Sequence, residues 1–95
     1  MNFQVIFRPN AERDLDEMEE YLALRFSPHN AARYVDRIIA ACKSIGVAPY
    51  RGTRRDDIRP GVRTTGFEKR VTITFEVEAE TVVILGIFYG GRMPR

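Results

Sequence analysis

The fold is decided by residues 70–92, which read RVTITFEVEAETVVILGIFYGGR. Val71, Ile73 and Phe75 alternate with polar residues, a period-two pattern that predicts a strand with one buried face. After a short acidic turn, residues 81–89 form a nearly continuous apolar run, which favours a strand in the centre of a sheet. Together the two strands predict an antiparallel hairpin near the end of the chain.

Two earlier stretches predict further strands. Residues 62–67 precede the hairpin, and Phe3, Val5 and Phe7 alternate with other residues at the start of the chain. Residues 47–60 contain prolines, a glycine and several charged side chains, so we expect an exposed loop. Loops of this length in a compact domain are often functional.

Apolar residues at three- and four-residue spacing predict two helices after the first strand. Ser27 and Pro28 separate them, a helix-capping residue followed by one suited to the first helical position. Gly46 is expected to end the second helix in a left-handed cap. So short a connection makes the helices fold back as an antiparallel hairpin. The expected buried faces are Ala11, Leu15, Met18, Leu22 and Phe26 in the first helix, and Ala32, Val35, Ile38, Ile39, Cys42 and Ile45 in the second.

These elements define an α+β fold in the order β-α-α-β-β-β. Both helices carry an apolar stripe, and packing the N-terminal helical hairpin on one face of a mainly antiparallel sheet buries both stripes. A chain of 95 residues can build one modest core. We therefore expect residues 1–95 to form a single domain.

Composition narrows the functional classes. An apolar fraction of 44% and a charged fraction of 29% are ordinary for globular proteins. No apolar run reaches the length of a membrane span and no signal peptide is recognisable, so we expect a cytoplasmic protein without membrane contact. Cys42 and His29 are the only residues of their types, which excludes a disulfide framework, a cysteine-based zinc site and a histidine pair within one chain. We expect no metal and no cofactor.

Positive charge is concentrated in the second half of the chain. Residues 1–50 carry six Lys and Arg against seven Asp and Glu, whereas residues 51–95 carry nine against six. Arg63, Arg70 and Arg92 could gather on one open surface of the sheet. Three arginines would stabilise a phosphate or an acidic peptide through charge-assisted hydrogen bonds. A solvated sheet face whose acidic residues neutralise the arginines explains the same pattern.

The sequence as a whole resembles the RelE/ParE superfamily of toxins from type II toxin-antitoxin systems, and it is more similar to the ParE branch. The resemblance covers almost the full chain. It is carried, in this order, by Ala11-Glu12-Arg13-Asp14-Leu15, the helical hairpin, Pro49-Tyr50-Arg51-Gly52, Ile58-Arg59-Pro60-Gly61-Val62-Arg63, Arg70-Val71-Thr72-Ile73-Thr74-Phe75 and Gly86-Ile87-Phe88-Tyr89-Gly90-Gly91-Arg92.

The resemblance implies a toxin held inactive in a hetero-oligomer by a ParD-like antitoxin, whose C-terminal segment wraps the toxin. For ParE-like members the implied target is DNA gyrase, whereas for RelE-like members it is messenger RNA on the ribosome. Contact with operator DNA would run only through the antitoxin. A module that binds its antitoxin and has little toxicity is a third possibility that the sequence leaves open.

Site residues follow from the same resemblance. Arg70 and Arg92 fall where RelE-like nucleases place two catalytic arginines, and Arg63 falls near one of their basic positions. No lysine pair precedes Arg70, and no tyrosine follows Arg92. Because a ribonuclease needs a proton-transfer group beside its cations, we favour gyrase inhibition and assign no catalytic residue. Arg63, Arg70, Tyr89 and Arg92 are expected to bind the target or the antitoxin.

Overall fold

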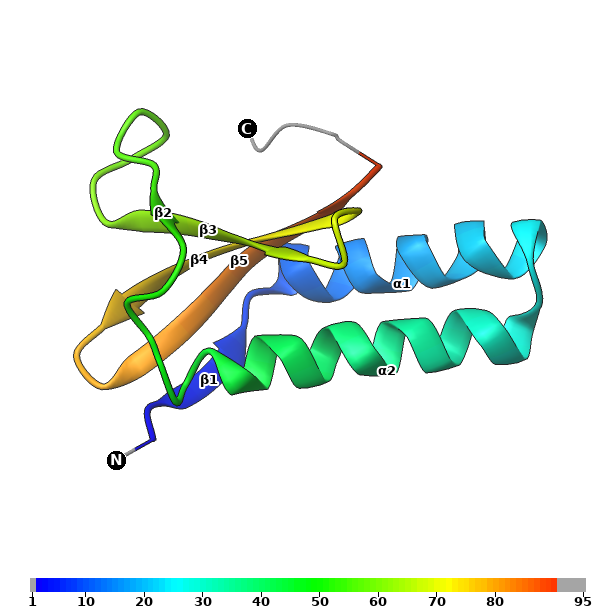
Figure 1. The fold of residues 1–95 in the computed structure, drawn as a ribbon, viewed down its shortest axis with the longest axis horizontal. Helices are drawn as coiled ribbons and strands as arrows, with labels where there is room; N and C mark the ends of the chain where they lie inside the picture. Colours follow the sequence, from blue (N-terminus) through cyan, green and yellow to red (C-terminus); the bar gives the residue numbers. More distant parts are fainter. Residues whose placement is uncertain (1, 91–95) are drawn as a thin grey trace.

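The structure, a computed structural model, describes residues 2–90 (Figure 1). Within this range the expected order of elements is confirmed, with one addition, a two-residue strand inside the expected loop. The elements are β1 (Gln4–Phe7), α1 (Pro9–Arg25), α2 (Pro28–Ser44), β2 (Thr53–Arg54), β3 (Val62–Phe67), β4 (Val71–Glu78) and β5 (Thr81–Tyr89).

The strands of the described residues form one five-stranded sheet in the order β1-β5-β4-β3-β2. β1 runs parallel to β5, and the other neighbouring pairs are antiparallel. β5 therefore lies between β1 and β4, which confirms the central position that its apolar run predicts. The α+β prediction, with a mainly antiparallel sheet, is confirmed as well.

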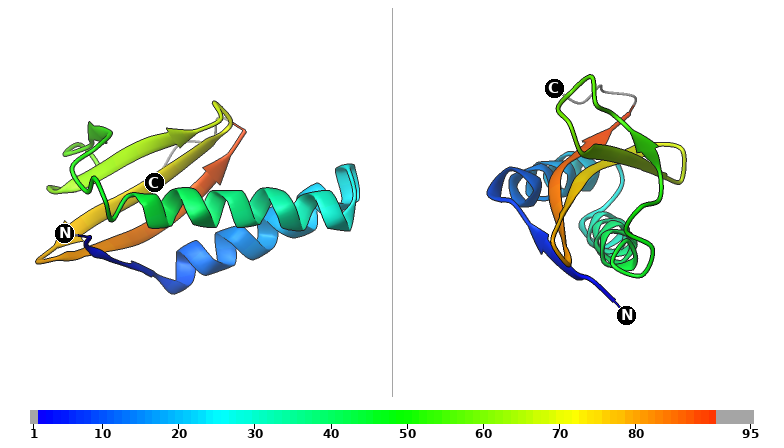
Figure 2. Two further views of the ribbon diagram at one scale, coloured as in Figure 1. Left: turned by 60° about the horizontal axis from the view of Figure 1, so that its bottom comes forward. Right: turned by 90° about the vertical axis from the view of Figure 1, so that its left-hand side faces the viewer.

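Both helices cover one face of the sheet (Figure 2). Ser27 caps α2 as expected, because its hydroxyl oxygen accepts a hydrogen bond from the Asn30 N–H at 3.1 Å, and Pro28 begins the helix. The apolar stripes of the helices and the inner face of the sheet bury a common core. Its members are Ala11, Leu15, Met18, Leu22, Ala31, Val35, Ile38, Cys42, Ile45, Val71, Ile73, Phe75, Val82, Ile84 and Ile87.

Two residues of the expected helix faces were assigned wrongly, and a third, Ile39, is only partly buried against the core. Ala31 is buried in α2, whereas Ala32 is only half-buried, because Ala31 stands one turn before the buried Val35. Phe26 is 69% exposed because α1 ends at Arg25, one residue before it. The end of the helical hairpin therefore presents an aromatic side chain to solvent instead of burying it.

The role expected of Gly46 is also wrong. Gly46 is not left-handed, and the residue that caps α2, Ile45, is in the right-handed helical region. A side chain on Gly46 would collide with the carbonyl oxygen of Phe3, whose N–H donates to the Gly46 carbonyl oxygen at 2.8 Å. The glycine is needed because the start of the chain passes directly against the end of α2.

The opposite face of the sheet is covered in part by residues 55–61, on the side away from the helices (Figure 1). Strand pairing aligns Val62, Glu76 and Val83 in one row, and both valines are buried. The Arg59 guanidinium donates to the Glu76 carboxylate at 2.9 Å, which fastens this loop to the row. Part of the expected loop is therefore a cover for the sheet.

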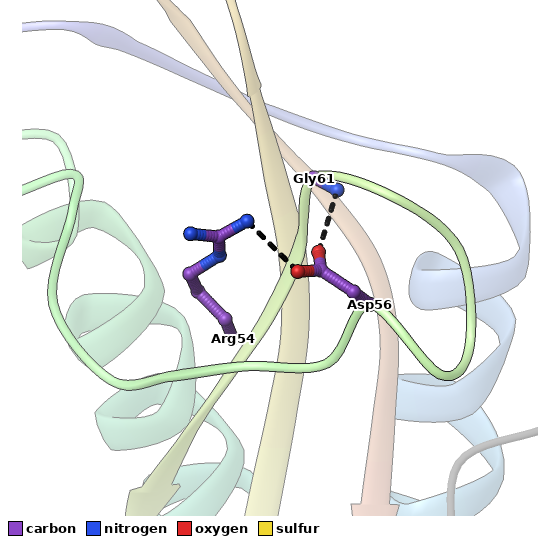
Figure 3. Close-up of polar contacts among 3 residues, drawn as sticks. All are labelled: Arg54, Asp56 and Gly61. Carbon is purple, nitrogen blue, oxygen red and sulfur yellow. Dashed lines mark hydrogen bonds and ion pairs between the residues drawn. The ribbon is translucent and has the colours of Figure 1, made fainter.

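Asp56 closes the same loop, as Figure 3 shows. One carboxylate oxygen accepts from the Arg54 guanidinium at 2.8 Å, and the other accepts from the Gly61 N–H at 3.2 Å. Gly61 has a φ of 89°, a left-handed conformation that glycine adopts without steric cost. These contacts hold the tight loop that leads from β2 to β3.

Asp14 joins α1 to the last strand. β1 pairs with β5 only as far as Ile84, and beyond that point α1 runs beside the strand. Pairing between β4 and β5 shifts by one residue, so that Leu85 is extra. The Ile87 N–H has no strand beside it to accept its hydrogen bond, and it donates instead to the Asp14 carboxylate at 3.0 Å.

Candidate functional site

The candidate site lies where the end of β5 meets the helical hairpin. Val71 pairs with Tyr89, and the Gly90 N–H donates to the Arg70 carbonyl oxygen at 2.9 Å. Strand pairing thus brings Arg70 and Tyr89 together, although they are 19 positions apart in the sequence. We call the group formed by Tyr21, Tyr34, Phe67, Arg70 and Tyr89 the tyrosine-arginine site.

Aromatic side chains from four elements form its centre. The ring of Tyr89 lies 6.2 Å from that of Tyr21 and 6.4 Å from that of Tyr34, between centroids. Tyr34 also meets Phe67 edge-to-face at 6.0 Å. Such aromatic pairs are each worth about 0.5–1.5 kcal/mol beyond the area they bury. The site therefore has a fixed aromatic framework supplied by α1, α2, β3 and β5.

Arginines of the helices flank this framework. The Arg37 guanidinium carbon lies 5.9 Å from the ring centre of Tyr34 and 5.6 Å from that of Phe67, and Arg37 forms an ion pair with Glu68. Glu68 and Lys69 are the central residues of the turn Phe67–Arg70 between β3 and β4, in which the Arg70 N–H donates to the Phe67 carbonyl oxygen at 3.3 Å, and their φ angles are 51° and 64°. Positive φ at both positions is the type I′ pattern that suits a hairpin. The turn thereby holds Glu68 over α2.

Two clefts open on either side of Tyr89. One, of about 390 Å³, is acidic at its far wall; the other, of about 330 Å³, contains both Arg70 and Glu68. The first is lined by Asp14, Glu17, Met18, Tyr21, Ile87, Tyr89 and Gly90, and the second by Leu22, Phe26, Asn30, Ala31, Tyr34, Glu68, Arg70 and Tyr89. Tyr89 therefore forms a wall shared by both clefts.

The phenol of Tyr34 is held in its neutral form. Burial raises its pKa and the neighbouring Tyr89 raises it further, whereas Arg37 and Arg70 partly offset the effect. At neutral pH the hydroxyl can therefore donate or accept a hydrogen bond, but it is not a base. The Tyr34 hydroxyl can therefore recognise a polar group of a partner through a hydrogen bond.

Arg63 lies away from the site. Arg63 pairs with Phe75, four residues along β3 from Phe67, a separation of roughly 13 Å. Its guanidinium donates to the Tyr50 carbonyl oxygen at 2.9 Å and lies 5.6 Å from the Tyr50 ring centre. The expectation that Arg63 and Arg70 gather on one surface is wrong, because Arg63 is used to hold the segment that follows α2.

Arg70 also differs from its expected position. It precedes β4 and lines the cleft on the helix side, instead of sharing the outer face with Thr72 and Thr74. The turn before β4 redirects it, since the strand alternation begins only at Val71. Arg92 lies outside the described residues.

Sequence reasoning missed Tyr21, Tyr34 and Arg37 as members of this region. A signal was present: Tyr21 and Arg25 are four residues apart, and Tyr34 and Arg37 three, the spacings at which helix side chains meet. The Arg25 guanidinium does lie 5.2 Å from the ring centre of Tyr21. Packing of the helices against the sheet, which the sequence does not state, then places the rings of Tyr21 and Tyr34 beside Tyr89.

Other candidate groups are separate from this site. Cys42 is fully buried, and burial raises the pKa of its thiol to about 12, so it is not a nucleophile. His29 is exposed in the first turn of α2. Among residues 2–90, His, Cys, Asp and Glu side chains form no group of three or more that could hold a metal ion. In the same range neither helix is long and apolar enough to cross a membrane.

A helical hairpin on one face of a mixed sheet is also the architecture of chains from two toxin-antitoxin structures. A chain from the chromosomal ParDE system of P. aeruginosa is 25% identical, with a TM-score of 0.81 over 93% of this chain and 96% of that one. A chain from the RelBE2 complex of Mycobacterium tuberculosis is 17% identical, with a TM-score of 0.69 over 94% and 99%, which shows a shared fold alone. The fold class is that of ParE and RelE toxins.

A family model narrows this class. The model described as the ParE toxin of type II toxin-antitoxin systems, parDE, matches residues 5–94. The chain therefore belongs to the ParE toxin family. A search of curated proteins gave no match.

Proposed function

We propose that this toxin acts in the cytoplasm by binding DNA gyrase and that a ParD-like antitoxin neutralises it. In this proposal residues 1–95 work as one domain, and operator DNA is contacted only through the antitoxin. The observation that carries the proposal is the tyrosine-arginine site, which offers anchoring side chains around two clefts. Tyrosine and arginine are the residue types that most often dominate the energy of protein interfaces.

Exposed apolar residues extend this surface to the end of the helical hairpin. Leu24 is 89% exposed and Phe26 is 69% exposed, and Phe26 also lines the cleft that contains Arg70. The hairpin projects past the sheet at this end (Figure 1). Large apolar side chains beside a polar cleft favour a protein partner over a small polar substrate.

The chemistry of the site favours binding over ribonuclease action. Its Tyr34 phenol has a raised pKa, and Glu68 is paired with Arg37. Cleavage of RNA requires a group that moves a proton beside the cations. Burial makes the Tyr34 phenol a poorer base and the ion pair occupies Glu68, so Arg70 supports docking of an acidic segment better than catalysis.

The test is a gyrase supercoiling assay with the purified toxin. We expect inhibition by the wild type and at least about a tenfold loss of potency in Arg70→Ala and Tyr89→Ala, the loss that follows from removing an interface anchor. Arg33→Ala is the matched control, because Arg33 is exposed on α2 outside both clefts. Circular dichroism establishes that each variant is folded.

Two outcomes would reject the proposal. Cleavage of messenger RNA in a translating extract, with gyrase unaffected, would establish the RelE-like ribonuclease function instead. Harmless expression without antitoxin, together with tight antitoxin binding, would establish a binding module of little toxicity. Arg92→Ala, expressed in cells without antitoxin, is expected to relieve the growth arrest caused by the wild type if Arg92 belongs to the binding surface.

A further inference from the structure

The last strand, β5, changes the set of residues that face the helices part of the way along its length. Val82 and Ile84 belong to the core under the helices, and so does Ile87. Side chains of a strand alternate between its two faces, so an uninterrupted β5 would turn only even-numbered residues toward the helices. The step from Ile84 to Ile87 therefore contains one extra residue.

The extra residue is Leu85, which the pairing between β4 and β5 skips. Such a β-bulge re-aims the side chains that follow it. Without it, the alternation would turn Phe88 toward the helices and Tyr89 away from them. With it, Phe88 lines a cleft on the opposite face of the sheet, and the Tyr89 ring meets that of Tyr34 on α2. The bulge is therefore what brings Tyr89 into the tyrosine-arginine site.

A side chain of α1 holds the strand just after this bulge. β1 accompanies β5 only as far as Ile84, and among the described residues no other strand lies on that side. The Asp14 carboxylate accepts the hydrogen bond of the Ile87 N–H, 73 positions further along the chain. A part-buried N–H that loses its acceptor is destabilising. Asp14 therefore favours the arrangement of β5 that contains the bulge.

Gly86 leaves room for this contact. A methyl group in place of its hydrogen would lie 3.2 Å from the Phe88 ring and 3.4 Å from the Asp14 carboxylate oxygen that binds Ile87. The ring and the carboxylate thus already fill the space around Gly86. The chain supplies the acceptor on α1 and, at the bulge, a residue small enough to let it approach.

We infer that Asp14 is a positioning residue of the tyrosine-arginine site, because it takes the place of a strand beside the bulge and thereby fixes the direction of Tyr89. Tyr89 forms a wall of both clefts, so its direction shapes both. Asp14 also lines one cleft, and direct contact of its charge with a partner is the competing explanation. The effect on potency rests on the proposed function, whereas the placement of Tyr89 is measured on the toxin alone.

The placement of Tyr89 is tested by NMR on the purified toxin. Nuclear Overhauser effects are expected from Tyr89 to the rings of Tyr21 and Tyr34, whose centroids lie 6.2 Å and 6.4 Å away. Asp14→Ala is expected to weaken both signals, whereas Asp14→Asn retains an oxygen for the Ile87 N–H and should keep them. Asp16→Ala is the matched control, because it removes a carboxylate from an exposed position of α1 outside both clefts.

The consequence for binding is tested in the gyrase supercoiling assay. Asp14→Ala should raise the half-inhibitory concentration about tenfold, as expected for a displaced interface anchor. Asp14→Asn keeps the oxygen in place without its charge and should retain the potency of the wild type. Asp14→Glu keeps the charge but moves the oxygen by one methylene, so it should lose potency, and it replaces Asp14→Ala as the test if that variant does not fold.

A double variant shows whether Asp14 acts through Tyr89. Once Tyr89 is removed, a residue that only positions it has nothing left to position, so the two losses are not additive. Asp14→Ala combined with Tyr89→Ala should therefore be no less potent than Tyr89→Ala alone. Two independent contacts would instead multiply their losses to about a hundredfold.

Three results would overturn the inference. Unchanged ring contacts of Tyr89 in Asp14→Ala and Asp14→Glu would show that the bulge keeps its place without the carboxylate. A loss of potency in Asp14→Asn equal to that in Asp14→Ala would assign Asp14 to direct contact through its charge, as would additive losses in the double variant. A wild type that does not inhibit gyrase would reject the proposed function alone, because the ring contacts still decide whether Asp14 positions Tyr89.

Discussion

The two faces of the sheet are built in different ways. The face under the helices is closed by fifteen buried residues from both helices and from β4 and β5. The other face buries Val62 and Val83 beneath a loop that polar contacts fasten, and it leaves a cleft beside Thr74. The first face therefore carries most of the stability, whereas the second can retain an unpaired polar group.

The largest expected loss of stability comes from a substitution in the core of the helix-covered face. Phe75 is fully buried there, so Phe75→Ala should lower the free energy of unfolding by about 3–5 kcal/mol. Ile58 is half-buried on the other face, and Ile58→Ala should cost less than about 2 kcal/mol. Urea denaturation followed by circular dichroism compares the two variants. Equal losses would contradict the division of stability between the faces.

The next effect concerns the joint between α1 and β5. Asp14→Ala leaves the part-buried Ile87 N–H without an acceptor and should cost about 1–3 kcal/mol in the free energy of unfolding. Asp14→Asn keeps an oxygen at this position and should recover part of the loss. Hydrogen exchange at the Ile87 amide provides the measurement. An amide that stays equally protected in Asp14→Ala would show that the carboxylate is dispensable.

The buried Cys42 thiol, in the core under the helices, makes the stability of the protein depend on pH. Burial raises the pKa of its thiol from 9.0 to about 12, so the unfolded chain ionises first. Its contribution to stability is complete below pH 9 and is lost as the pH rises from 9 toward 12. Between pH 8 and pH 10 the wild type should lose about 1 kcal/mol relative to Cys42→Ala. Parallel denaturation curves at the two pH values would contradict this expectation.

The smallest expected effect concerns the loop that Asp56 closes on the outer face of the sheet. Asp56→Ala removes the acceptor of both the Gly61 N–H and Arg54, and should cost about 0.5–1 kcal/mol. Arg54→Ala removes an exposed ion pair alone and should cost less than about 0.5 kcal/mol. Urea midpoints at low and high salt distinguish them, because salt screens the ion pair and leaves the backbone bond intact. A larger loss of stability in Arg54→Ala than in Asp56→Ala would show that the ion pair, and not the hydrogen bond to the Gly61 N–H, holds the loop closed.

The elements of the fold could be predicted because each has a local signal. Alternation marks β4, a continuous apolar run marks β5, and Ser27 with Pro28 marks the break between the helices. β2 was missed since two residues are too short for any periodicity. Gly46 was misread because a close approach of Phe3 is a tertiary fact that no neighbouring residue reveals.

The candidate site was less predictable. Arg70 and Tyr89 were selected through the family resemblance, and strand pairing does bring them together. Arg63 was misplaced because its partner, the Tyr50 carbonyl oxygen, depends on the path of the segment after α2. Tyr34 was overlooked since its importance comes from facing Phe67 and Tyr89 across the interface between helix and sheet.

The pairing of β1 with β5 has a consequence for the order of events during synthesis. Residues 4–7 are made before all the other described elements of the fold, yet their strand partners are residues 81–84. Until those residues leave the ribosome, the first strand has no neighbour and the helices have no complete sheet to cover, because β5 supplies the centre of that sheet. The growing toxin therefore stays incompletely folded until β5 has been synthesised.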